Sequence, residues 1–388
     1  MIIVSVLSVL LLGCDFQKRT DDSNQKDSEM RGSHREPESQ LAEASPRPPI
    51  RVVQSKPLCD GSKIGMYVWD QAHWRDPSPE KGFLKHLSTS HARRLTCGDI
   101  FINVADYSSA LQISDSNQLV PFILQARKAG NLGVIWLTYG DVTEKDSAAC
   151  KAFVNTFFTW VDTIPDNLIR KVIPIGLSYD IENFPVDVIT DTLVSAQKRK
   201  KQLIHKFGND GLLIQCTIDG QIRPLQTDAI MKHADRALAM AYRNYIYSTN
   251  DPDGTKNGLL QQLTILFKEQ CVHCLDDLYA TENYRAEITV MVETACKMGK
   301  SCSFVSFCAY DGAETGGVDY LSKTLRNIDE LIVSSGLMSS SQKERLFSKS
   351  APYAVHDWDW FQCFYRVETD TNPKCKTYAS YAKACRSM

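Results

Sequence analysis

Two acidic residues end an otherwise apolar stretch, and their spacing suits acid–base chemistry. Residues 172–185 read Val-Ile-Pro-Ile-Gly-Leu-Ser-Tyr-Asp-Ile-Glu-Asn-Phe-Pro, so Asp180 and Glu182 follow a mostly apolar run. Such a run is typical of a strand buried on both faces. Because side chains alternate along a strand, we expect both carboxyl groups on one side and Ile181 on the other. Two carboxyl groups at the end of a buried strand are costly to desolvate, which predicts a working site.

The elements that must position this pair form a repeating pattern of strand-like and helix-like segments. The predicted strands cover residues 64–69, 99–105, 133–138, 172–179, 212–218, 236–242, 303–310 and 352–356. Most are followed by a predicted helix, and the segment 284–298, with apolar residues at helical spacing, is also predicted to be a helix. This order predicts a single (β/α)8 barrel. An open doubly wound sheet is the alternative, but residues 69–73 lack the Gly-rich turn expected there.

The chain of 388 residues divides into three predicted parts. Residues 1–14 form a signal peptide, because their apolar core is too short for a comfortable membrane span. The residues before and including Cys14 also resemble a bacterial lipobox, in which Cys14 would be acylated. Residues 15–56 are polar and rich in Ser, Glu and Pro, which predicts a disordered linker, and residues 57–388 form the barrel domain. We therefore expect a secreted monomer, without membrane contact unless it is lipid-anchored at Cys14.

Cysteine usage agrees with an oxidising compartment. The chain has 13 cysteines; without Cys14 an even number remains, which behind a signal peptide favours disulfides. Cys271 and Cys274 have the spacing of a zinc-ligand pair, but no second pair follows at zinc-site distance, so a disulfide staple is the preferred interpretation. Cys216 lies in a predicted strand and could be a small buried apolar residue. We predict no metal and no cofactor.

Acidic and aromatic residues gather at the predicted C-terminal ends of strands, where barrel enzymes carry their chemistry. Aromatic rings stack on the C–H faces of sugars while carboxylates bind the hydroxyl groups, so this pattern predicts an oligo- or polysaccharide partner. The predicted substrate-binding residues are Tyr67, Trp69, Asp106, Trp136, Asp219, Arg243, Asp311, Trp358 and Trp360. Taken singly, such acids are also common turn or helix-cap residues, and a Trp can belong to the core. The net charge of −2 does not indicate the excess of positive charge that is typical of nucleic-acid-binding proteins.

At three strand ends the sequence resembles the family 18 glycoside hydrolases, the chitinase-like barrels. Their fourth strand ends in Asp-Gly-x-Asp-x-Asp-x-Glu, and Ile175-Gly-Leu-Ser-Tyr-Asp-Ile-Glu182 keeps the Gly, the last Asp and the Glu. Their sixth strand carries Met-x-Tyr-Asp, of which Met240-Ala-Tyr242-Arg243 keeps the Met and Tyr. Their eighth strand ends in a Trp that forms the base of the sugar-binding site, and Trp358 or Trp360 could take this place here.

The resemblance implies a secreted glycoside hydrolase that cleaves β-linked glycans, including those that contain N-acetylglucosamine. Glu182 would be the general acid that protonates the leaving glycosidic oxygen. Asp180 would orient the substrate's N-acetyl group, whose carbonyl oxygen acts as the internal nucleophile, and Tyr242 would hydrogen-bond to it. These three residues are the predicted catalytic residues.

The sequence departs from the family pattern at positions that leave two alternatives open. Ile175 and Ser178 stand where the family has Asp, and Arg243, where the family has an acid or amide, could pair with Glu182. One alternative is a glycosidase with two carboxylates, in which the partner of Glu182 is Asp219, Asp311, Glu314 or Asp357. The other is a lectin-like barrel that binds carbohydrate without cleaving it.

Overall fold

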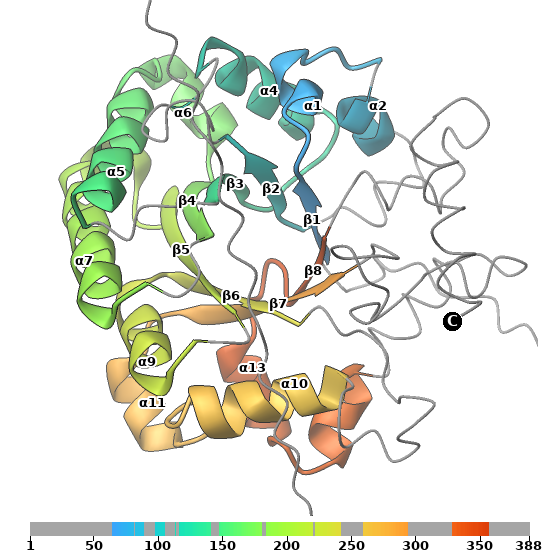
Figure 1. Cartoon of the computed structure of the whole chain (residues 1–388). Helices are drawn as coiled ribbons and strands as arrows, with labels where there is room; N and C mark the ends of the chain where they lie inside the picture. The colour runs from blue at the N-terminus through green and yellow to red at the C-terminus, as the bar shows by residue number, and fades with distance from the viewer. Residues whose placement is uncertain are drawn as a thin grey trace, which may run out of the picture. The chain divides into compact units, whose positions relative to one another are not determined.

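Eight parallel strands close into a barrel. The computed structural model describes residues 64–80, 82–88, 98–104, 113, 116–140, 147–180, 184–219, 222–241, 259–293 and 328–356, all within the unit Gln54–Met388. The strand order is β1-β2-β3-β4-β5-β6-β7-β8, and β8 pairs back onto β1. Figure 1 shows the strands at the centre with helices around them. The predicted (β/α)8 barrel is confirmed.

The strands are short, apolar and largely buried, as expected for a parallel sheet that is covered by helices. Their bounds are β1 (Ile64–Val68), β2 (Ile100–Asn103), β3 (Ile135–Gly140), β4 (Ile175–Asp180), β5 (Leu212–Ile218), β6 (Arg236–Met240), β7 (Glu287–Glu293) and β8 (Tyr353–His356). Seven of these lie at predicted strand positions; β7 does not.

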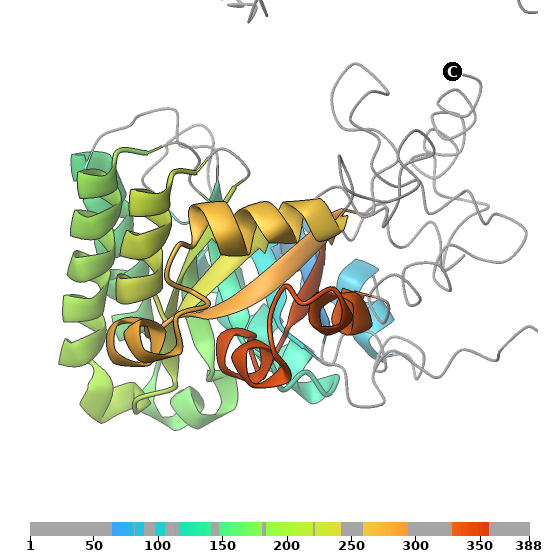
Figure 2. The ribbon, with the colours of Figure 1, turned by 90° about the horizontal axis from the view of Figure 1, so that it is seen from below.

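Helices follow most strands and pack against the outside of the barrel (Figure 2). They are α1 (Ala72–Arg75), α2 (Gly82–Ser88), α4 (Ser116–Lys128), α5 (Ser147–Asp162), α6 (Asp166–Val172), α7 (Val186–Gln202), α8 (Ile204–Phe207), α9 (Pro224–His233), α10 (Leu259–Ile265), α11 (Asp277–Asn283) and α13 (Ser340–Leu346). A π-helix, η1 (Leu266–Gln270), continues α10. Among the described residues, no helix has both the length and the apolar character that a membrane span requires.

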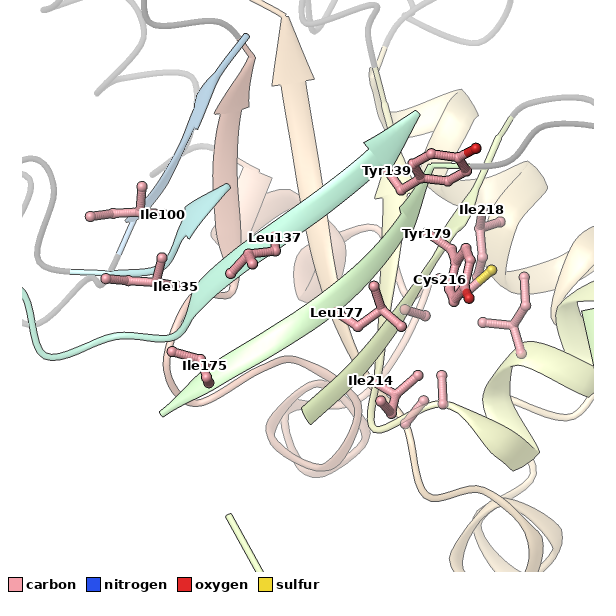
Figure 3. Packing of buried hydrophobic residues seen from close by; sticks show 14 of the residues in the cluster. Ile100, Ile135, Leu137, Tyr139, Ile175, Leu177, Tyr179, Ile214, Cys216 and Ile218 are labelled. Carbon is pink, nitrogen blue, oxygen red and sulfur yellow. The ribbon is translucent and has the colours of Figure 1, made fainter. Parts of the chain in front are cut away.

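Alternation along the strands separates an outer core from the barrel interior. In β4, Ile175, Leu177 and Tyr179 belong to the apolar layer between strands and helices, and Figure 3 shows them beside their counterparts on β3 and β5. A smaller cluster fills the interior and includes Tyr67, Phe101, Trp136, Leu238 and Met291. The side chains of Ser178 and Asp180, which alternate with the outer set, therefore face the interior and its mouth.

The predicted helix over residues 284–298 is wrong, because the structure places strand β7 there. The strand pairs with β6 and β8 and supplies the seventh position of the barrel. Its sequence, Glu-Ile-Thr-Val-Met-Val-Glu, is dominated by β-branched residues, which favour a pleated strand over a helix. Ile288 and Val292, which fit a helical period, also fit a period of two. The predicted seventh strand, residues 303–310, lies outside the described residues, as do the predicted signal peptide and linker.

The disulfide predicted between Cys271 and Cys274 is confirmed. It lies directly after η1, and both cysteines are buried. Cys150 and Cys216 are buried, which agrees with the interpretation of Cys216 as a small apolar residue on the outer face of β5.

Substituting Gly176 with Ala is expected to destabilise the barrel by about 1–3 kcal/mol. A Cβ atom at this position of β4 would overlap the six-membered ring of Trp136. Trp136 is fully buried, and its indole donates a 2.8 Å hydrogen bond to Asp99, so the ring has little room to move. Urea unfolding would measure the loss. Combining Gly176→Ala with Trp136→Leu should cost less than the sum of the single losses; strict additivity would contradict the overlap.

Candidate functional site

Among the described residues, Trp69, Asp180, Asp219 and His356 lie at the C-terminal rim of the barrel. Trp69 directly follows β1, Asp180 ends β4, Asp219 directly follows β5 and His356 ends β8. Because all eight strands are parallel, these positions belong to one rim, the end at which barrel enzymes carry their chemistry. Trp69, Asp180 and His356 are partly exposed, whereas Asp219 is 7% exposed. The rim therefore offers an aromatic surface and two carboxyl groups.

The aromatic part of the rim is held together by direct contacts. The indole N–H of Trp69 donates a hydrogen bond to Nε2 of His356, and the two rings meet edge to face with centroids 5.8 Å apart. Tyr67, fully buried beneath them, lies 4.9 Å from the Trp69 ring and 5.3 Å from the His356 ring. These contacts fix the orientation of Trp69, so a ligand ring could stack on it at little cost in side-chain entropy.

Asp180 and Asp219 lie at the ends of the neighbouring strands β4 and β5. Burial raises the pKa of Cys216 well above its usual range, a backbone hydrogen bond at Thr217 lowers it, and the negative charges of Asp180 and Asp219 raise it further. Strand β4 pairs with β5, and Asp180 ends β4 while Asp219 directly follows β5, so the two predicted residues lie on the same side of the barrel mouth.

A row of neutral polar side chains crosses the barrel just below this rim. Strand pairing places Asn103, Thr138, Ser178 and Gln215 in register on β2, β3, β4 and β5, and each is at most 2% exposed. The Ser178 hydroxyl donates a 2.6 Å hydrogen bond to Oε1 of Gln215. Ser178 stands where the resemblance expects an acid, so the support beneath Asp180 is uncharged here.

Two atoms of this row have no hydrogen-bond partner among the described residues, namely Oγ1 of Thr138 and Nε2 of Gln215. An unpaired buried polar group costs about 1–3 kcal/mol, and most buried polar groups are paired with protein or with water. The sequence alone did not reveal this row. Each member has an inward position in its strand, but only the strand register shows that the four lie side by side.

Trp136 does not lie with the rim residues. It is the second residue of β3, near the N-terminal end, and is fully buried. Its ring stacks on Phe101 with centroids 6.2 Å apart, and Phe101 stacks on Tyr67 in turn. Its indole N–H donates to Asp99, and the Arg236 guanidinium lies 5.5 Å from its centroid. In this structure Trp136 therefore packs the base of the barrel.

The remaining predicted site residues fall outside the described part of the chain. They are Asp106, Glu182, Tyr242, Arg243, Asp311, Trp358 and Trp360. Their roles remain predictions from the sequence. Within the described ranges, no three His, Cys, Asp or Glu side chains come together in a way that could hold a metal ion.

Comparison with known proteins yields structural similarity without sequence similarity. No protein-family model matches the chain, and no curated protein sequence matches it. Among solved structures, the chain is similar to the spore cortex-lytic enzyme SleL of Bacillus cereus, with 10% identity, a TM-score of 0.36, and coverage of 59% of this chain and 50% of that one. The chain thus spans about half the length of SleL.

Two further similarities extend over more of the chain. A GH18 chitinase from Pseudoalteromonas aurantia gives 11% identity and a TM-score of 0.39 over 79% of this chain and 99% of that one. The glycoside hydrolase domain of PgaB (BpsB) from Bordetella bronchiseptica gives 10% identity and a TM-score of 0.40 over 81% and 97%. Similarities of this size do not bear on activity or substrate.

Proposed function

We propose that this chain is a secreted glycoside hydrolase that cleaves β-linked glycans, including those with N-acetylglucosamine, and that Glu182 is its general acid. The observation that carries the proposal is the composition of the rim. Asp180 emerges partly exposed at the end of β4, and the same rim holds the fixed ring of Trp69. Carboxyl groups beside an aromatic face suit a sugar, which offers C–H faces and hydroxyl groups together.

The role assigned to Glu182 is the one that the resemblance to the family 18 glycoside hydrolases implies, and its position two residues after Asp180 agrees with it. The acid transfers its proton to the glycosidic oxygen as the bond to the anomeric carbon breaks, so the leaving sugar departs as a neutral alcohol. A general acid that works near neutral pH needs a raised pKa, which partial burial and a neighbouring carboxylate supply. In the sequence, Asp180 is two residues from Glu182 and is the carboxylate proposed for this effect.

Two routes complete the reaction, and they predict different products. In the first, the carbonyl oxygen of the substrate's N-acetyl group attacks the anomeric carbon, with Asp180 and Tyr242 orienting that group, and the anomeric configuration is retained after hydrolysis. In the second, a carboxylate such as Asp219 activates a water that attacks from the opposite face, and the configuration is inverted. Asp219 follows β5, the neighbour of β4 in the barrel, which supports this route. Proton NMR of the first-formed product anomer distinguishes them.

Secretion is part of the proposal. The apolar segment 1–12 has the length of a signal-peptide core, and the disulfide between Cys271 and Cys274 suits an oxidising compartment.

The test is release of reducing sugar by the purified protein from N-acetylglucosamine oligomers, chitin and other β-linked glycans. Release from any of them supports the proposal. Binding without release would favour the lectin-like alternative, and neither binding nor release would contradict both.

Replacing Trp69 with Ala is expected to raise the KM for a cleaved glycan about tenfold, because stacking on an aromatic ring contributes about 1.5 kcal/mol. Trp69→Phe keeps a ring but loses the hydrogen bond to His356, and should have a smaller effect. Trp160→Phe is the matched control, since Trp160 lies on α5 in the outer layer. Steady-state kinetics measure all three. An unchanged KM for Trp69→Ala would remove this residue from the site.

A further inference from the structure

A cavity of about 220 Å³ lies beside the barrel mouth, between the ends of β5 and β6 and the helix pair α10–η1. Two of its lining residues, Asp219 and Met240, also belong to the barrel mouth, since Asp219 follows β5 and Met240 ends β6. Figure 2 shows α10 crossing the outside of the barrel next to β7. The cavity therefore adjoins the proposed site without being part of it.

Glutamine side chains line the helical wall of the cavity. Gln261 and Gln262 come from α10, and Gln270 is the last residue of η1. The amide of Gln270 donates a 3.3 Å hydrogen bond to the main-chain oxygen of Asp219, which ties this wall to the rim. π-Helical turns are uncommon and occur frequently at functional sites, because the extra residue changes which side chains face inward.

The lining is matched to an uncharged ring with polar substituents. Amide side chains both donate and accept hydrogen bonds, as sugar hydroxyl and acetamido groups do, while Met240 and Ala239 offer an apolar surface for C–H groups. The volume is below the ~300–1,000 Å³ of pockets for drug-sized ligands, so it suits one monosaccharide unit. Of the described residues that line the cavity, Asp219 alone is charged, which disfavours an anionic sugar.

We propose that this cavity is a subsite for one neutral or amino-sugar unit of the glycan, next to the unit that is cleaved at the rim. The inference rests on the proposed function, because it takes the rim as the place of cleavage. It adds a substrate class, namely oligosaccharides of at least two units without a uronic acid at this position, and it assigns Gln261 as a residue that selects for chain length.

The experiment compares wild type with Gln261→Trp, which should fill the cavity from a half-buried helix position without disturbing the core. The probes are the N-acetylglucosamine tetramer and the 4-nitrophenyl β-glycoside of N-acetylglucosamine. We expect kcat/KM for the tetramer to fall about tenfold or more, and that for the short glycoside to stay unchanged. Lys268→Ala, an exposed position on η1, is the control and should match wild type.

Binding measurements keep this inference separate from the proposed function. If wild type cleaves the tetramer but Gln261→Trp cleaves both probes normally, the subsite is overturned while the function stands. If wild type binds the tetramer without cleaving it, calorimetry decides: about tenfold weaker binding by Gln261→Trp supports the subsite, and equal binding overturns it. Absence of both binding and cleavage overturns both. A uronic-acid tetramer that binds as tightly as the neutral one would overturn the assigned substrate class.

Discussion

Replacing Glu182 with Gln is expected to lower turnover of the glycan by about 10²–10⁴-fold while leaving its affinity nearly unchanged. Gln has the shape of Glu and keeps hydrogen-bonding atoms, but it has no proton to give to the glycosidic oxygen. The loss should be largest for substrates with a poor leaving group. For an activated aryl glycoside, whose phenolate needs little protonation, the loss should be much smaller.

The matched control for this prediction is Asp187→Asn, which removes an exposed carboxyl group in the first turn of α7. It should leave turnover unchanged. Single-turnover kinetics and calorimetry with the N-acetylglucosamine tetramer would measure rate and affinity separately. If Glu182→Gln cleaved the glycan at the wild-type rate, Glu182 would not be the general acid, and the acid catalysis proposed at this rim would be contradicted.

The stretch around β4 could be interpreted from the sequence because burial on both faces leaves a clear pattern. The predicted strand, residues 172–179, differs from β4 mainly at its start. Val172 ends α6, and the chain becomes extended at Ile173, because the residue before a proline avoids helical geometry and Pro174 has no N–H to donate. Alternation along the strand predicts which residues of β4 face outward and which face inward, and places Asp180 on the inward side.

Positions that depend on neighbouring strands could not be predicted in the same way. The row that joins Ser178 to Gln215 exists because the two residues are in register, and register between parallel strands joined by a long helical connection leaves no local signal. The strand β7 was missed because Ile288 and Val292 satisfy both a helical and a strand period over so short a segment. Its high content of β-branched residues was the signal that could have identified this segment as a strand and not a helix.

Trp136 shows that position within a strand matters as much as residue type. Trp69 follows the last residue of its strand, whereas Trp136 is close to the first residue of its own. In a parallel barrel the first residues of strands lie at the end opposite to the chemistry. The sequence therefore contained the information that separates a rim tryptophan from one that packs the base.

The base of the barrel should be the part most sensitive to a single substitution, and Asp99→Ala is expected to lower the free energy of unfolding by about 3–5 kcal/mol. The Asp99 carboxylate is fully buried. It accepts hydrogen bonds from Arg236 at 2.5 Å, from the Trp136 indole at 2.8 Å and from the main-chain N–H of Val134 at 2.9 Å. Without Asp99, the buried guanidinium of Arg236 keeps one ion-pair partner among the described residues. This partner is the Glu287 carboxylate, 3.3 Å away.

Three variants test whether the loss comes from the buried charge. Asp99→Asn keeps the shape and one acceptor oxygen and should lose less than Asp99→Ala. Asp99→Ala combined with Arg236→Met removes both charges and should recover part of the loss. Asp191→Ala breaks the exposed pair with Lys151 and should cost at most about 1 kcal/mol. Because the base lies at the end opposite to the rim, the folded fraction of Asp99→Ala should keep the wild-type KM. Equal losses in urea unfolding for Asp99→Ala and Asp191→Ala would mean that the base network does not stabilise the barrel.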